Sequence, residues 1–153
     1  YNFRMMETQA AIGIHQLDRV SSFIETRRRL FNRYEKQLQH LNGVKIQYQE
    51  LEDEKKSYIS PFAFGFYIVD DKYKRNDLFK YLTKNQIESR TLVAGNLSRQ
   101  PIFTDLYKNC IKVADDLTNA DKVHFNGLYT PLHPNMSTDD VDYVCVKLRE
   151  FFQ

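Results

Sequence analysis

The 153 residues are enough for one domain with a buried core, and 42% hydrophobic and 27% charged residues are typical of a soluble globular protein. A net charge of +2 gives no argument for a nucleic-acid partner or an acidic membrane surface, and every apolar run is far shorter than the ~20 residues of a membrane span. Cys110 and Cys145 lack metal-ligand spacing, so two reduced thiols in the cytoplasm are the simpler interpretation, with a disulfide as the alternative.

The first forty residues predict two helices. Apolar residues recur at spacings of three and four over residues 5–17 and again over residues 20–41, as one face of a helix requires. The run Arg27-Arg28-Arg29 interrupts the second stripe, which indicates a solvated or ion-paired face, with a binding patch as the alternative. Asn42-Gly43 then provides a left-handed stop signal.

An aromatic strand is predicted in the middle of the chain. A short strand over residues 44–48 and a charged, mobile loop over residues 49–57 precede it. No basic residues are interleaved with the aromatic ones, which favours core packing over the stacking of nucleic-acid bases. The residues that alternate onto one face of this strand are Phe62, Phe64, Phe66 and Ile68.

Helices and strands alternate in the second half of the chain. The expected elements are a helix over 76–84 that ends at Asn85, a strand over 88–93, helices over 100–107 and 117–125, a strand over 127–132, and a final helix after a turn at 133–135. The expected helix caps are Asn76 or Asp77, Thr118 and Ser137. The expected inward-facing residues are Leu78, Phe79 and Leu82 in the first of these helices and Val141, Val144, Cys145, Leu148 and Phe152 in the last. This order predicts an α+β fold, a small, mostly antiparallel sheet packed with helices.

One loop suggests binding chemistry. The strand that ends at Val93 breaks at Ala94-Gly95-Asn96, and Arg90 and Arg99 flank the break. Guanidinium forks match phosphate and carboxylate oxygens in pairs, so the loop is a candidate anion site, with a surface turn and two solvated arginines as the alternative. The sequence contains no complete catalytic constellation, because the four histidines are scattered and neither a glycine-rich phosphate loop nor a nucleophile elbow is present.

Four blocks of sequence resemble the C-terminal domain of the DegT/StrS family of pyridoxal-phosphate-dependent nucleotide-sugar aminotransferases. They cover nearly the whole chain in the family's order, which makes their combination specific. This resemblance implies the small C-terminal domain of a fold-type I transferase. The blocks are residues 1–5 with 9–13 and 16–17, residues 27–28 leading to Tyr34, residues 87–90 through 94–101, and residues 126–129 with His133-Pro134 and the final helix.

The third block narrows the resemblance. Sugar aminotransferases of the family usually carry a histidine-containing loop there, whereas the Ala-Gly-Asn-Leu-x-Arg-Gln-Pro pattern over 94–101 is similar to the branch of 4-keto-6-deoxy-sugar 3-dehydrases. Residues 117–121 and 126–129 also look like that branch. Residues 129–132 differ from the family's usual small residues before the His-Pro turn, which loosens any inference about which sugar fits.

The resemblance implies roles for four residues. Asn2 matches the asparagine that reaches across the dimer interface to the phosphate of the neighbouring subunit's cofactor, with a turn-forming asparagine as the alternative. Arg90, Asn96 and Arg99 match the loop that lines the substrate side of the site. The two arginines are expected either to hold the diphosphate of a nucleotide sugar or to brace the loop.

The resemblance also implies that the cofactor, pyridoxal 5'-phosphate or pyridoxamine 5'-phosphate, is bound mainly by an N-terminal domain outside this sequence. That domain would supply the Schiff-base lysine, or the histidine that replaces it in the dehydrases. Cysteines for an iron–sulfur cluster would also lie there, and Cys110 and Cys145 do not match them.

The chain is therefore expected to be the C-terminal part of a longer enzyme and to be catalytically inert alone. Residues 1–153 would form one domain, with a helical interface region over 1–41 and a small α+β domain over 42–153. The intact enzyme would be a cytoplasmic homodimer that acts on a nucleotide sugar in deoxysugar or lipopolysaccharide biosynthesis, without nucleic-acid or membrane partners.

The alternative is a stand-alone α+β module that binds an anionic ligand or a protein partner. The two hypotheses differ in their surfaces. The enzyme hypothesis predicts an exposed apolar face on the helix over 5–17, whereas the stand-alone module predicts none.

Overall fold

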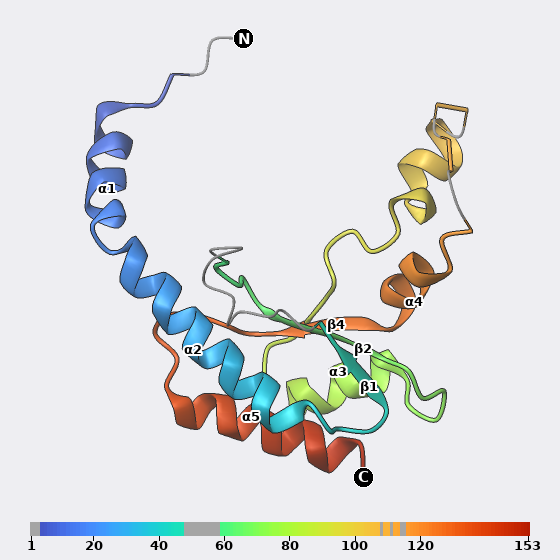
Figure 1. Ribbon diagram of the computed structural model, residues 1–153. Coiled ribbons are helices and arrows are strands. Elements are labelled where there is room, and N and C mark those ends of the chain that lie inside the picture. Colours follow the sequence, from blue (N-terminus) through green and yellow to red (C-terminus); the bar gives the residue numbers. More distant parts are fainter. Residues whose placement is uncertain (1–3, 48–58, 108, 111, 114–115) are drawn as a thin grey trace.

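A four-stranded antiparallel sheet forms the centre of the computed structural model, which describes residues 4–47, 59–107, 109–110, 112–113 and 116–153 (Figure 1). The strand order is β1 (Val44–Ile46), β2 (Phe64–Ile68), β4 (Gly127–Thr130) and β3 (Arg90–Thr91). Every neighbouring pair is antiparallel. The predicted α+β class is confirmed. The loop over 49–57 that the sequence predicts to be mobile lies outside the described residues.

Helices α2 (Val20–Leu38), α3 (Arg75–Lys84) and α5 (Thr138–Phe151) lie on one side of this sheet, and α2 runs beside α5 (Figure 1). Their apolar faces meet the inward side of β2 and β4 in a single core. The buried apolar residues of the helices are Leu30, Phe31, Tyr34, Leu38, Leu78, Leu82, Val141, Val144, Cys145 and Leu148. Phe79, predicted to face inward, is 42% exposed, because it lies on the outer face of α3.

The aromatic strand β2 lies in the core, where four of its five residues are buried. Phe64 is fully buried and stacks on Tyr34 of α2, with ring centroids 4.6 Å apart. The predicted core packing is confirmed for Phe64, Phe66 and Ile68. It is wrong for Phe62, which precedes β2 and is 72% exposed. Alternation alone cannot show where a strand leaves the sheet.

The ends of α5 and α3 show where the expected helix caps are right and where they are wrong. Ser137 caps α5 as expected, since its Oγ accepts from the backbone N–H of Asp140 and the carboxylate of Asp140 accepts from the N–H of Ser137. The expected caps of α3 are wrong, because α3 begins at Arg75 and its N-cap Lys74 makes no side-chain hydrogen bond. Asn85 is the C-cap of α3, as predicted.

The expected cap of α4 (Thr118–Asn126) is also wrong. Thr118 is the first helical residue, and its backbone N–H donates to Oδ1 of Asp116 at 3.0 Å. Leu117 is the N-cap, with a left-handed φ of 59°. The short helix expected over 100–107 is present as a π-helical turn at Ile102–Leu106, with Pro101 as its N-cap. A 3-10 turn at Leu97–Arg99 precedes it.

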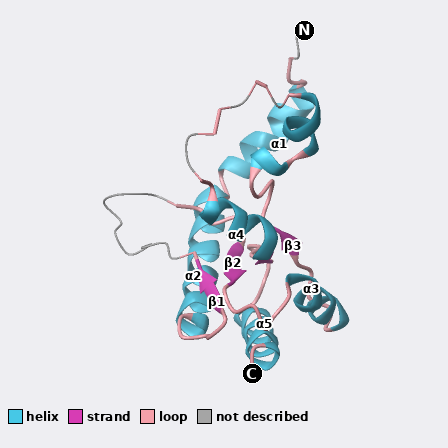
Figure 2. Cartoon of the chain, turned by 90° about the vertical axis from the view of Figure 1, so that its right-hand side faces the viewer, coloured by secondary structure: helices cyan, strands magenta, loops and turns pink. Residues whose placement is uncertain are grey.

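Helix α1 (Glu7–Leu17) stands away from the sheet, on the side opposite α5 (Figures 1 and 2). None of the residues of α1 is buried. In the turn that follows α2, Gly43 adopts the expected left-handed conformation, with φ of 86°. Across the described segments, we find no helix with both the length and the apolar character needed to cross a membrane.

Candidate functional site

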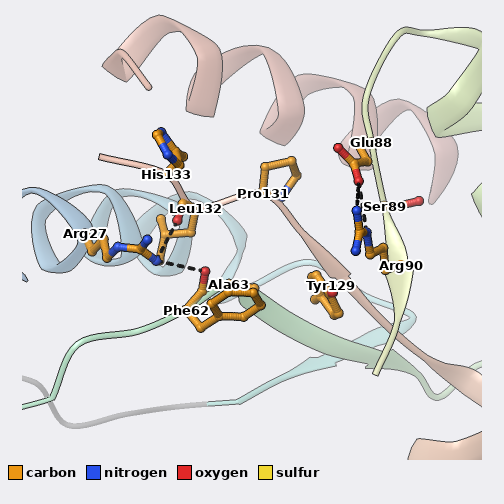
Figure 3. A pocket seen from close by; sticks show the side chains of 10 residues that line it. All are labelled: Arg27, Phe62, Ala63, Glu88, Ser89, Arg90, Tyr129, Pro131, Leu132 and His133. Carbon is orange, nitrogen blue, oxygen red and sulfur yellow. Dashed lines mark hydrogen bonds and ion pairs between the residues drawn. The ribbon is translucent and has the colours of Figure 1, made fainter. Parts of the chain in front are cut away.

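A pocket of about 430 Å³ lies between Arg27 of α2 and Arg90 of β3, and we call it the two-arginine pocket (Figure 3). The sheet brings its walls together, because Arg90 pairs with Tyr129 across β3 and β4. Segments before β2 and after β4 complete it. The side chains that line it include those of Arg27, Phe62, Glu88, Arg90, Tyr129 and Pro131.

Arg27 holds the wall of this pocket by binding backbone oxygens. Its Nη1 donates to the carbonyl oxygens of Pro61 at 3.2 Å, Phe62 at 3.2 Å and Leu132 at 3.1 Å. These carbonyls belong to the segment before β2 and the segment after β4. The prediction of a solvated or ion-paired face is therefore wrong for Arg27. Nothing in the local spacing signals this clamp, because its acceptors are 34, 35 and 105 residues away.

Arg90 faces the pocket as one half of an exposed ion pair. Its Nε and Nη2 donate to Oε1 of Glu88 at 2.9 and 2.7 Å, and this hydrogen bond raises the pKa of Arg90 above its ordinary value. The two side chains remain about two-thirds exposed, at 68% and 67%. Both groups therefore stay accessible to a ligand, because an exposed pair of this kind is weak and is easily rearranged.

Aromatic rings line the space between the two arginines. The rings of Phe62 and Tyr129 meet edge to face, with centroids 6.2 Å apart. Figure 3 shows Tyr129 and Pro131 between the two guanidinium groups. A ring face suits the C–H surface of a sugar, a carboxylate accepts from hydroxyl groups, and a guanidinium binds phosphate oxygens. The pocket therefore combines groups suited to a glycosyl phosphate.

Ser89 lies between Glu88 and Arg90 in the sequence, and its side chain points to the opposite side of the chain from theirs (Figure 3). It is 6% exposed, and its Oγ has no hydrogen-bond partner among the described residues. Burial of an unpaired hydroxyl is unfavourable, so Ser89 costs stability where it lies.

Asn96 and Arg99 do not line this pocket, and both bond to Asp121 of α4. Asn96 is 3% exposed and donates through Nδ2 to Oδ1 of Asp121 at 2.7 Å. Arg99 donates to both oxygens of the same carboxylate, at 3.1 and 2.7 Å. The structure thus separates the two arginines of the predicted anion site, placing Arg90 in the two-arginine pocket and Arg99 on Asp121. The contacts of Arg99 are those of the loop-bracing alternative.

Gly95 allows the loop to approach α4 this closely. Its φ is +53°, and a Cβ atom there would lie 2.6 Å from Nδ1 and 2.9 Å from Cα of His124. The second of these atoms is backbone and cannot rotate away. Glycine is therefore required at this position by both conformation and contact.

The two-arginine pocket offers no side chain that is free to form a Schiff base with a cofactor. No lysine lines the two-arginine pocket, Arg27 is engaged by carbonyls and Arg90 by Glu88. Asn2, the predicted contact to a cofactor phosphate, lies outside the described residues. Within the described ranges no cluster of three or more histidine, cysteine or acidic side chains is arranged to hold a metal. Cys110 and Cys145 are both free thiols, as the simpler interpretation of the sequence predicts.

A small antiparallel sheet with helices on one side, a protruding first helix and a pocket beside β3 define the small domain of a fold-type I pyridoxal-phosphate enzyme. The chain belongs to the DegT/DnrJ/EryC1/StrS aminotransferase family, whose profile matches residues 1–149. The family resemblance drawn from the sequence is confirmed.

Two curated relatives and one crystal structure illustrate the match. The lipopolysaccharide biosynthesis protein RfbH of Salmonella typhimurium is 34% identical over 99% of this chain and 34% of its own length. A dTDP-4-dehydro-2,6-dideoxy-D-glucose 3-dehydratase of Saccharopolyspora spinosa is 30% identical over 99% of this chain and 31% of its own. The E. coli GDP-4-keto-6-deoxy-D-mannose-3-dehydratase with bound hydrated PLP superimposes with a TM-score of 0.84, at 30% identity, over 100% of this chain and 36% of that one. The chain thus spans about a third of the length of these proteins.

Proposed function

We propose that this chain is the small domain of a nucleotide-sugar 3-dehydratase that depends on pyridoxal 5'-phosphate or pyridoxamine 5'-phosphate and acts in deoxysugar or lipopolysaccharide biosynthesis. The observation that carries the proposal is the two-arginine pocket, with its aromatic lining, its carboxylate and its guanidinium groups, in a chain of this family. The dehydratase branch is favoured over amino transfer by the pattern over 94–101 and by the names of relatives such as that of S. spinosa.

In this proposal the pocket supplies one wall of the substrate site. Tyr129 and Phe62 contact the apolar face of the sugar, Glu88 accepts from a sugar hydroxyl, and Arg90 binds a phosphate oxygen. When bound, the cofactor supplies the electron sink for removal of the hydroxyl group. The proposal assigns its binding mainly to the remainder of the polypeptide, with Asn2 as the predicted contribution of this chain.

Residues 129–132 are proposed to set the preference for one sugar over another. They depart from the usual sequence of the family, and Tyr129, Pro131 and Leu132 all line the two-arginine pocket. A larger side chain at this place narrows the pocket and limits which substituents a sugar ring can carry.

The exposed first helix supports an interface role for residues 1–41. Met5, Ile12 and Leu17 are 72%, 63% and 69% exposed, and Met6 and Ile14 are both 62% exposed. An apolar surface of this kind is typical of a face that another domain or subunit covers. We assign it to the remainder of the polypeptide and to the second subunit of a cytoplasmic homodimer. The stand-alone module, which predicts no such face, is correspondingly disfavoured.

The test is to purify the full-length polypeptide and to record absorbance between about 320 and 420 nm, where bound pyridoxal and pyridoxamine phosphates absorb. The protein is then incubated with L-glutamate, which supplies the amino group and the two electrons that turnover consumes, and with GDP-, dTDP- or CDP-linked 4-keto-6-deoxy sugars. The masses of the products are measured by mass spectrometry. A cofactor band and loss of one oxygen from the sugar support the dehydratase, whereas gain of an amino group supports amino transfer. A full-length protein with neither band nor turnover contradicts the proposal.

Arg90→Met tests the pocket itself. We expect KM for the nucleotide sugar to rise, because a phosphate contact is lost, while the cofactor band is unchanged. Arg33→Met is the matched control, since Arg33 also forms an exposed bidentate pair but lies on the α2–α5 side, with Asp142. Equal effects of the two substitutions would remove Arg90 from the substrate site.

A further inference from the structure

One carboxylate joins the Gly-Asn loop to α4. Oδ1 of Asp121 accepts from Nδ2 of Asn96 and from Nε of Arg99, and Oδ2 accepts from Nη2 of Arg99. The bonds from Arg99 and then Asn96 lower the pKa of Asp121 to about 2, so the carboxylate is ionised at neutral pH. Both of its oxygens are then occupied by donors from the loop.

The loop depends on this support because its backbone is locally unfavourable. Ala94 has a φ of 61° and Gly95 a φ of 53°, and the first of these is a conformation that alanine rarely adopts. The backbone N–H of Asn96 donates to Nδ1 of His124 at 3.2 Å, one turn after Asp121 on α4. Contacts to α4 therefore hold the loop in a shape that its own preferences do not favour.

The supported loop adjoins the proposed substrate wall. Leu92 and Val93 alone separate it from β3, the strand that begins at Arg90. A second hollow, of about 730 Å³, is lined by Leu92 and Gly95 of this segment and by Tyr129, which also lines the two-arginine pocket. In Figure 1 the segment leaves the sheet and runs up beside α4. A shift of the loop thus moves one end of β3 and the residues paired with it.

We propose that Arg99 is a positioning residue, which fixes the substrate side of the site through Asp121, and that it is not itself a ligand for the substrate's diphosphate. This inference rests on the proposed function. Nε and Nη2 of Arg99 are both used by Asp121, and the carboxylate offsets the guanidinium charge. Asp121 and Asn96 take part in the same attachment of the loop to α4. The sequence patterns over 94–101 and 117–121 therefore contain the two sides of one contact, with the donors Asn96 and Arg99 in the first and the acceptor Asp121 in the second.

Asp121→Asn separates the two roles of Arg99 by the sign of its effect. If Arg99 bound the diphosphate, loss of the neighbouring negative charge would release the guanidinium, and KM would fall or stay unchanged. If Arg99 positions the loop, loss of the bidentate acceptor weakens the loop's attachment, and KM rises. The two roles therefore predict different results, because KM rises only if Arg99 positions the loop.

Asp142→Asn is a closely matched control. Asp142 of α5 also accepts from an arginine Nε, that of Arg33 at 2.6 Å, and from a side-chain amide, that of Gln37 at 2.5 Å. The two carboxylates have the same types of donor, and their side chains are 23% exposed in Asp121 and 36% in Asp142. Only Asp121 touches the loop.

The experiment uses the full-length holoenzyme as wild type, Asp121→Asn and Asp142→Asn, with a nucleotide sugar that the wild type turns over. We expect Asp121→Asn to raise KM about fivefold or more, with kcat within about twofold, and to speed hydrogen exchange over residues 94–103. Asp142→Asn should do neither, although both variants should lose similar thermal stability. A KM at or below the wild-type value in Asp121→Asn, or equal effects of the two variants, overturns the inference.

If Asp121→Asn does not fold, Arg99→Lys distinguishes the two roles of Arg99 instead. Lysine keeps a positive charge for a phosphate but cannot make a bidentate bond. A KM raised as far as that of Arg99→Gln supports positioning, and a KM near the wild-type value overturns it. A wild-type protein without cofactor band or turnover would instead contradict the proposed function. In that case faster exchange over 94–103 confined to Asp121→Asn still supports the loop attachment, and its absence overturns it.

Discussion

Phe62 and Phe64 belong to the same alternating set of apolar residues, yet the structure predicts very different losses of stability when each is replaced by alanine. Phe64 is fully buried, stacks on Tyr34 with centroids 4.6 Å apart, and meets Phe31 at 5.3 Å. Loss of a buried phenyl ring costs about 3–5 kcal/mol through lost burial and a residual cavity. The aromatic contacts, at about 0.5–1.5 kcal/mol each, place Phe64→Ala in the upper half of that range. Replacing Phe62 should lower the free energy of unfolding by about 1 kcal/mol or less, because its side chain is 72% exposed and makes one edge-to-face contact, with Tyr129.

The assay is urea unfolding of wild type and the two variants, followed by far-ultraviolet circular dichroism and tyrosine fluorescence, since the chain has ten tyrosines and no tryptophan. The urea midpoint should fall clearly below that of wild type for Phe64→Ala and stay close to it for Phe62→Ala, with unchanged slopes. Equal costs for the two substitutions, or a cost below about 1 kcal/mol for Phe64→Ala, would refute the placement of β2 in the core.

Three further predictions concern the site. Gly95→Ala should destabilise the protein by about 1–2 kcal/mol from the left-handed backbone alone, with more from the contact at 2.9 Å to Cα of His124; an unchanged urea midpoint would contradict this. Ser89→Ala should leave stability unchanged or raise it by up to about 1 kcal/mol, because an unpaired buried hydroxyl is removed; a clear fall in melting temperature would reveal a partner for Oγ. The pKa of Asp121 is lowered from 3.8 to about 2, so its contribution to stability is present above pH 3.8 and is lost as pH falls through about 2. Acid titrations of stability should therefore be flatter in Asp121→Asn, and identical slopes would count against the assigned bonds.

Features that depend on neighbouring residues could be predicted from the sequence. The cap at Ser137, the end of α3 at Asn85 and the buried face of α5 all follow from spacing within one helix. The class of fold follows from the order of such elements. Family membership required more, since it came from several blocks taken together and not from any single residue.

Features that depend on distant residues could not. Arg27 lies in a run of three arginines that reads as a surface face, and its clamp exists only because the fold brings three carbonyls to it. Leu117 carries no sequence signal for a left-handed conformation, unlike Gly43. The pairing of Arg99 with Asp121 was likewise hidden, because 22 residues separate them.

The strand order has a consequence for synthesis of the protein on the ribosome. Among the strands that the structure describes, β4 comes last in the sequence, yet it lies between β2 and β3 and alone joins them. Until residues 127–130 emerge, β3 has no neighbour and the two-arginine pocket has no Tyr129. The apolar face of α2 must wait still longer, for α5. β1 and β2 can pair before that point, but β3 and the apolar face of α2 have no β4 or α5 to pack against until residues 127–151 have been made. Chaperones that cover apolar surface would act in that interval.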